Sequence, residues 1–315
     1  MNGTTNFVVI TRETQLEELI KKYNTKDQAR FYITHLGEDF DLYERQHRTY
    51  YQALEEVMQA LEKLGKIQRL DRSYLPNFIF GEEDIVVVVG QDGLVANTMK
   101  YLNRQSIIAV NPDKSFWDGV LLPFEAKDLK KIVPETIKGK RRVKEVTMAK
   151  ASLQDGQVLY AVNDLFIGPK THSSARYKLQ FGERAERQSS SGIIVSTGLG
   201  SSGWLKSILC GAIGISSQVE AHSASVLEQN GFLMPNLTWD SRALIFSVRE
   251  PFPSKHSQAG CVFGEIREDK PLLLTSQMPE NGVIFSDGVE SDFLVFSSGM
   301  QAEIAIAERR GHLVV

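Results

Sequence analysis

One short stretch, Ile85–Val89, constrains the fold of this chain more than any other. Its sequence is IVVVV, so every residue in it is apolar and β-branched. A run that does not alternate between apolar and polar residues predicts a strand buried on both faces, which is typical of a parallel sheet. The sequence Gly90-Gln91-Asp92-Gly93 follows, and residues 94–102 have the apolar spacing of a helix. We therefore predict an α/β domain whose central strand turns sharply into a helix.

The junction between this strand and this helix has the features of an anion-binding site. Gly90 and Gly93 let backbone amides approach a phosphate closely, and the helix dipole adds partial positive charge. The carboxylate of Asp92 would repel a phosphate, but it is suited to accept a proton from an attacking hydroxyl. An ordinary turn in which Asp92 caps the helix is the alternative, and the spacing alone leaves both interpretations open.

Strands and helices alternate in the first 125 residues, as a parallel α/β sheet requires. The expected strands are at residues 7–10, 67–70, 85–89 and 107–110, and the expected helices at residues 12–23, 42–64 and 94–102. Thr11 is expected to cap the first helix and Gly65 to end the second. We assign residues 1–125 to a Rossmann-like α/β domain with a parallel sheet.

Two polar residues follow the strand expected at residues 107–110. Ligands of open α/β sheets bind at the carboxyl ends of the strands, so Asn111 and Asp113 are expected to lie near Asp92. Both are predicted as possible phosphate or nucleotide contacts, together with Gly90 and Gln91. The alternative is that Asn111 and Asp113 only form an Asx-Pro turn.

Many short strands separated by turn residues are expected in the second half of the chain. Strand-like runs lie at residues 142–151, 158–167, 177–181, 193–195, 243–248, 272–275, 282–285, 293–296 and 302–306. Asp155-Gly156 is a hairpin signal, and a helix is expected at residues 204–213. We predict an all-β sandwich over residues 126–315.

Composition excludes several classes of protein. The net charge of −3 over 315 residues gives no strong field for nucleic acid. Two cysteines make neither a disulfide framework nor a thiolate metal site, and the six histidines lack metal-ligand spacing. The first residues show no basic region followed by an apolar one, so no leader sequence is expected, and no apolar run approaches the roughly 18 residues of a membrane span. We expect a soluble cytoplasmic protein without a nucleic-acid or membrane partner and without a metal site of its own.

Polar residues in the second half mark further candidate sites. Asn163-Asp164 interrupts the apolar segment VLYAVNDLFIG, and buried polar groups need a ligand or a buried network to satisfy them. Residues 189–204, SSSGIIVSTGLGSSGW, offer many small donors to a ribose or phosphate, although a flexible loop has a similar sequence. Asp287, in Ser286-Asp287-Gly288, lies in a predicted hairpin turn. No phosphate-binding loop of the G-x-x-x-x-G-K-[ST] type and no G-x-S-x-G motif is present.

Three motifs resemble those of the NAD kinase family, a branch of the superfamily that also holds diacylglycerol-type lipid kinases. Residues 90–94, GQDGL, are similar to the family's G-G-D-G-T. Residues 161–164, AVND, are similar to A-L-N-E/D, and residues 196–204, STGLGSSGW, to S-T-P-T-G-S-T-A-Y. The three occur in the family's order. The resemblance covers most of the chain, is clearest over residues 84–204, and looks closest to the mitochondrial-type branch.

The resemblance implies a kinase with NAD bound in a cleft between an α/β domain and a β-sandwich domain. The implied reaction transfers a phosphoryl group from ATP, with Mg²⁺, to the 2′-hydroxyl of the adenosine ribose of NAD and gives NADP. Asp92 would be the base on that hydroxyl. The implied NAD-binding residues are Gly93, Asn163, Asp164, Ser196, Thr197, Ser201, Ser202, Gly203 and Trp204. Asp287 matches a late turn of the family loosely, as a possible nucleotide contact. The resemblance also implies a homodimer or higher homo-oligomer.

The chain departs from the family pattern at three positions. Gln91 replaces a glycine, which would cause strain if the backbone there needed a positive φ. Leu94 replaces a hydroxyl residue and removes a possible phosphate ligand. Ser191 stands where many members have an acidic residue. Gln91 and Leu94 leave open the alternative of a catalytically weak NAD-binding or regulatory protein. The wider superfamily leaves open a second alternative, a kinase of lipids or other small alcohols.

Overall fold

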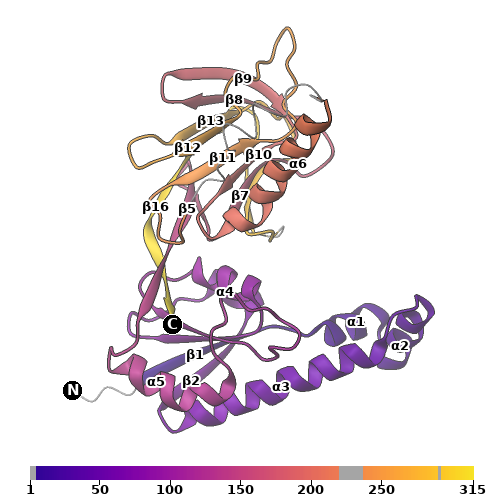
Figure 1. Cartoon of the computed structure of the whole chain (residues 1–315), viewed down its shortest axis with the longest axis vertical. Helices are drawn as coiled ribbons and strands as arrows, with labels where there is room; N and C mark the ends of the chain where they lie inside the picture. The colour runs from indigo at the N-terminus through magenta and orange to yellow at the C-terminus, as the bar shows by residue number, and fades with distance from the viewer. Residues whose placement is uncertain (1–4, 220–236, 290–291) are drawn as a thin grey trace. The chain divides into compact units, whose positions relative to one another are not determined.

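The computed structural model describes residues 5–219, 237–289 and 292–315, and these form two compact units (Figure 1). The first unit comprises the chain up to Lys144 together with His312–Val315, and the second comprises Glu145–Gly311. The first is an α/β unit and the second a β-sandwich, so the predicted fold class is confirmed. The predicted domain boundary at residue 125 stays a prediction, and the helix α5 (Leu129–Ile137) that follows it belongs to the first unit.

A parallel sheet forms the centre of the first unit. Its strands are β1 (Thr5–Thr11), β2 (Gly65–Asp71), β3 (Ile85–Val89) and β4 (Ser106–Val110), in the order β2-β1-β3-β4. All five residues of β3 are buried, as its β-branched run predicts. The end of β16 (Gln301–Val314) extends this sheet, because His312 and Leu313 pair in parallel with Ser106 and Ile107 of β4.

The first unit also contains several helices. They are α1 (Gln15–Tyr23), α2 (Lys26–His35), α3 (Phe40–Glu62), α4 (Asp92–Met99) and α5, with 3₁₀ turns at Arg72–Asn77 and Ala126–Asp128. The apolar stripe of α3, which includes Tyr50, Leu54 and Val57, packs in one core with Phe7 and Val87 of the sheet. Figure 1 shows α1 and α2 together at one end of α3.

Local capping corrects two predictions in the first unit. Thr11 is the last residue of β1, and the cap of α1 is Thr14, which exchanges hydrogen bonds with Glu17 in a capping box. Gly65 does not end α3, which stops at Glu62; it begins β2, where a Cβ atom would lie 2.1 Å from the carbonyl oxygen of Thr5. Glycine is therefore needed there for close strand packing rather than for a helix end.

Two antiparallel sheets form the second unit. In the described residues, one contains β5 (Val143–Leu153), β6 (Val158–Ala161), β8 (Ala175–Phe181), β9 (Arg184–Ser190), β13 (Leu272–Ser276) and most of β16. The other contains β7 (Asp164–Pro169), β10 (Ile193–Ser196), β11 (Leu244–Val248), β12 (Phe263–Ile266), β14 (Gly282–Ser286) and β15 (Phe293–Val295). Side chains of both sheets, among them Tyr177 and Phe246, share one core.

The predicted strand at residues 158–167 is in fact two strands. β6 ends at Ala161 and β7 begins at Asp164, and the two belong to different sheets. An apolar run cannot show this break, because both strands contribute to the same core. The polar pair Asn163-Asp164 therefore lies where the chain passes from one sheet to the other.

One helix, α6 (Trp204–Val219), packs beside β10 and β11 through Leu205, Leu209 and Ile245 (Figure 1). It begins at the predicted residue and runs beyond the predicted end at residue 213. Of the helices in the described ranges, none is both long enough and apolar enough to cross a membrane.

Candidate active site

The turn after β3 connects directly to α4. Gln91 is the N-cap residue, with φ −120° and ψ 167°, and its carbonyl oxygen accepts the amides of Leu94 and Val95. Gly90 lies close to the helix, since a Cβ atom there would be 2.8 Å from the Leu94 side chain. Asp92 is thus the first residue of the helix and not its cap.

The carboxylate of Asp92 is held by a backbone amide from another loop. Its Oδ1 accepts a hydrogen bond of 2.6 Å from the amide of Leu121. Its Oδ2 makes no hydrogen bond to any described residue, and the side chain is half-buried. One oxygen therefore orients the carboxylate while the other remains able to accept a proton or a hydrogen bond.

The two departures in this turn cause no strain. The φ of Gln91 is negative and extended, a conformation open to any residue, so a glycine is not required there. Leu94 is 3% exposed and packs in the protein interior, so a hydroxyl at its place would have faced the core. Gly93 is the exposed member of the turn, and a Cβ atom there would meet only the end of the Gln91 side chain at 4.0 Å.

The loop after β4 is held by Asn111. Its Nδ2 donates to the carbonyl of Trp117 at 3.0 Å, and its Oδ1 accepts the amide of Asp113 at 3.0 Å. The Asp113 Oδ1 in turn accepts both the amide and the hydroxyl of Ser115. Asn111 is almost fully buried. These are the bonds of the predicted Asx-Pro turn, and they shape the loop that passes beside the β3–α4 turn.

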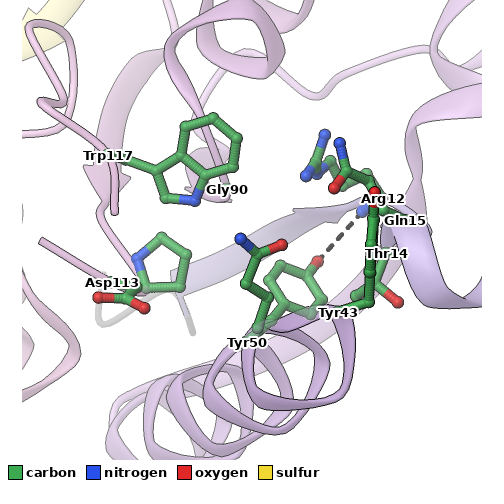
Figure 2. A pocket seen from close by; sticks show the side chains of 10 residues that line it. Arg12, Thr14, Gln15, Tyr43, Tyr50, Gly90, Asp113 and Trp117 are labelled. Carbon is green, nitrogen blue, oxygen red and sulfur yellow. Dashed lines mark hydrogen bonds between the residues drawn. The ribbon is translucent and has the colours of Figure 1, made fainter. Parts of the chain in front are cut away.

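A pocket in the first unit lies between this loop, the β3–α4 turn and α3 (Figure 2). Gly90 and Asp113 line it, so the structure brings together two of the predicted phosphate contacts. Arg12 and Trp117 also line it, with the guanidinium carbon 5.8 Å from the centre of the indole ring. The sequence prediction missed Arg12 and Trp117, although Arg12 directly follows the first strand, at the edge where ligands of such sheets bind.

In the second unit, the carboxylate of Asp287 joins the strand ends around residues 162–164. It accepts the amides of Val162, Asn163 and Asp164 at distances from 2.6 to 3.3 Å. The amide of Asp287 donates to the carbonyl of Asp164 at 2.9 Å. Its φ is +54°, a conformation that Asp tolerates better than most residues. Asp287 therefore shapes the break between β6 and β7 in addition to forming a turn.

Asp164 is a strongly perturbed carboxylate at this break. Its pKa is raised to about 7, chiefly by burial and also by the nearby charge of Asp287, while a hydrogen bond from Ser196 acts in the opposite direction. Its Oδ1 is buried and has no hydrogen-bond partner among the described residues. A buried oxygen without a partner needs a donor, and a ligand is one way to supply it. The side chain of the neighbouring Asn163 is half-buried and makes no hydrogen bond within the described residues.

Thr197 fixes the turn that follows β10. It is fully buried, and its hydroxyl donates to the Val162 carbonyl at 2.6 Å and accepts the Gly200 amide at 3.1 Å. Gly200 is in close contact with the other strand end, because a Cβ atom there would lie 2.2 Å from the Asn163 carbonyl oxygen. Ser196 is also fully buried, whereas Ser202 and Gly203 are exposed. The turn therefore has an inner side that supports Asn163 and an outer side open to a ligand.

The ring of Trp204 is held by its neighbours. It stacks on Phe166, with ring centres 5.9 Å apart and planes within 6°, and the Arg249 guanidinium lies 5.5 Å from its centre. Such a ring offers a rigid aromatic surface beside the exposed side of the turn. The structure thus gathers Asn163, Asp164, the residues 196–204 and Asp287 in one cluster of the second unit.

The fold is similar to those of a solved NAD kinase and a solved NADH kinase. An NAD kinase from Archaeoglobus fulgidus in complex with ATP superposes with a TM-score of 0.59 over 99% of this chain and 94% of its own, at 15% identity. The yeast NADH kinase complexed with NADH has a TM-score of 0.57 over 100% of this chain and 84% of its own, at 13% identity. The chain has the NAD kinase fold. No protein-family model matches its sequence, and a search of curated proteins finds no match.

Within the NAD kinase fold, the three motifs that carry the resemblance all lie at strand ends. GQDGL follows β3, AVND spans the end of β6 and the start of β7, and STGLGSSGW follows β10. Strand ends are where α/β and sandwich folds position their functional loops. The roles assigned to the individual residues stay predictions and are taken up next as a proposal.

Proposed function

We propose that the chain is an NAD kinase of the NAD kinase family, transferring a phosphoryl group from ATP to the 2′-hydroxyl of the adenosine ribose of NAD. The observation that carries this proposal is the geometry of Asp92. Its carboxylate follows the glycine turn at the carboxyl end of β3, is oriented by the Leu121 amide, and keeps Oδ2 without a partner in the described residues. A carboxylate held in this way suits a general base that receives a proton from a hydroxyl.

In the proposed reaction the 2′-oxygen attacks the terminal phosphorus of ATP while its proton passes to Asp92. The bond to the bridging oxygen breaks and ADP leaves. Little covalent chemistry is asked of the protein in phosphoryl transfer, so positioning and charge stabilisation supply most of the rate enhancement. Gly93, exposed and without close neighbours, leaves room for a ligand beside Asp92.

The cluster in the second unit is proposed to bind the NAD. The unpartnered Oδ1 of Asp164 and the side chain of Asn163 accept or donate hydrogen bonds to the nucleoside. Ser201, Ser202, Gly203 and Trp204 provide the outer side of the turn. Ser196 and Thr197, whose hydroxyls are buried, and Asp287 act by holding the strand ends that present Asn163 and Asp164.

Mg²⁺ is proposed to enter with ATP, as part of the substrate. Proteins commonly bind Mg²⁺ through one or two carboxylates together with the phosphates of the substrate. The cation then neutralises part of the negative charge of those phosphates. In the part of the chain that the structure describes, no three His, Cys, Asp or Glu side chains gather as metal ligands. NAD and ATP are the nucleotide ligands that this function requires. The homo-oligomer and the cytoplasmic location stay predictions.

The decisive experiment incubates the purified protein with NAD, ATP and Mg²⁺ and measures NADP with an NADP-specific dehydrogenase. Asp92→Asn should lower kcat by on the order of 10²–10⁴, the usual contribution of a general base, with NAD affinity little changed. Asp84→Asn is the matched control, because Asp84 lies before the opposite end of β3 and accepts the amide of Gly81. That variant should retain wild-type activity.

Three results would contradict the proposal or the role of Asp92 in it. NAD binding without NADP formation would support the alternative of a binding or regulatory protein with this fold. Phosphorylation of a lipid or small alcohol, with NAD unable to compete, would support a kinase of a different acceptor. An unchanged kcat in Asp92→Asn would remove Asp92 from the role of base.

A further inference from the structure

The pocket shown in Figure 2 is lined by hydrogen-bond donors that have no partner among the described residues. These are the guanidinium of Arg12, the side-chain amides of Gln15 and Gln46, and the indole N–H of Trp117. The hydroxyl of Tyr50 accepts the backbone amide of Arg12 at 3.1 Å, which leaves its own proton able to donate. A concave site with this excess of donors is complementary to a group that carries several acceptors.

Arg12 is the charged member of this set. It is half-buried, burial lowers its pKa, and no carboxylate of the described residues lies within ion-pair distance of it. A cation partly removed from water is costly unless an anion compensates it. The ring of Trp117, 5.8 Å away, gives only weak compensation.

Asp113 is the single carboxylate among the described residues that line the pocket. Its Oδ1 already accepts both the amide and the hydroxyl of Ser115, and it is too far from Arg12 for an ion pair. The guanidinium of Arg12 therefore lines the pocket without an ion-pair partner among the described residues, next to Gly90 and the start of α4, and Glu18 acts on it only at longer range. It can attract a negatively charged group. A helix N-terminus reinforces that preference for negative charge.

The pocket is small. Its volume is about 30 Å³, far below the roughly 300 Å³ or more of a site that encloses a whole small-molecule ligand. Its occupant is thus one end of a ligand, and the site opens beside the turn that carries Asp92.

We infer that this pocket binds the terminal phosphate of the phosphoryl donor, with Arg12 as its anchoring cation and Trp117 as its wall. The inference rests on the proposed function and adds to it the residue that recognises the donor. The planar fork of an arginine matches two phosphate oxygens at once. Arg12 would thus supply a contact to the phosphate of ATP that the side chain of Leu94, which is buried in the core, does not supply.

The first test measures binding without catalysis. Inorganic tripolyphosphate, which carries a terminal phosphate but no nucleoside, should raise the melting temperature of the full-length protein. Arg12→Met keeps the length of the side chain and removes its charge, and it should abolish that rise. Arg72→Met is the matched control, because Arg72 is exposed and near Arg12 but does not line the pocket, so the rise should persist. A rise that persists in Arg12→Met would overturn the inference.

The second test measures NADP formation as a function of each substrate. Arg12→Met should raise the KM for ATP roughly 10–100-fold, the effect of losing charged hydrogen bonds, and leave the KM for NAD unchanged. Arg12→Lys keeps the charge without the fork and should recover part of the loss. A folded Arg12→Met protein with an unchanged KM for ATP would overturn the inference. If the wild type makes no NADP but its tripolyphosphate response depends on Arg12, the pocket stands and the proposed function fails.

Discussion

At the scale of single residues, Asp164 is a carboxylate whose pKa lies far from its ordinary value. Burial holds its pKa at about 7, against an ordinary value of 3.8. The folded protein therefore keeps a proton on Asp164 between about pH 4 and pH 7 that the unfolded chain has lost. The folded state binds more protons in this range, so this group makes stability fall as pH rises, until the loss is complete above pH 7.

Asp164→Asn should remove this penalty. The free energy of unfolding of the variant, minus that of wild type, should therefore be larger at pH 8 than at pH 4. The increase should be up to about 4 kcal/mol, because one pKa unit corresponds to about 1.36 kcal/mol. Urea denaturation at both pH values measures the difference. Asp155→Asn is the control, because the pKa of Asp155 is lowered by its hydrogen bonds to Gln157 and its carboxylate is already ionised across that range. An equal pH dependence in wild type and Asp164→Asn would contradict the assignment.

At the scale of elements, the turn after β10 depends on how closely it approaches the strand end at Asn163. Gly200→Ala would place a Cβ atom 2.2 Å from a backbone oxygen that cannot move away easily. We expect a loss of roughly 1–3 kcal/mol in the free energy of unfolding, the usual range for overpacking, together with weaker NAD binding. Gly211→Ala is the comparison, because Gly211 is exposed in the helix α6 and a Cβ atom there would meet nothing within 4 Å. Its melting temperature should not fall below that of wild type, since alanine is a better helix former than glycine, and equal losses in both variants would contradict this account.

The same elements show what sequence could and could not predict. The β-branched run of β3 and the apolar stripe of α3 were predictable because each signal is local and repeated. The break at residues 162–163 was not, because the amides there are bound by Asp287, more than a hundred residues later. Arg12 was missed for a similar reason: its place in the pocket, beside Gly90 and Trp117, depends on how distant segments pack.

At the scale of the whole molecule, the chain ends inside the unit in which it begins. The second unit is an insertion between Lys144 and His312, and the last four residues return to the first unit. Leu313 and Val314 are almost fully buried there, and Leu313 pairs with Ile107 of β4. The sequence predicted the last strand only at residues 302–306, because its final residues are explained by a partner strand some two hundred residues earlier.

The first unit should therefore depend on residues that follow the second. Deleting residues 312–315 removes two buried apolar side chains and one strand partner of β4. We expect the free energy of unfolding of the first unit to fall by about 3 kcal/mol or more. Amide hydrogen exchange should accelerate in β4 and β3 while the strands of the second unit keep their protection, because stability is distributed by local packing. Deleting Val315 alone, which is only half-buried, is the control and should leave β4 protected. Unchanged protection of β4 in the longer deletion would show that the four parallel strands are stable without the end of the chain.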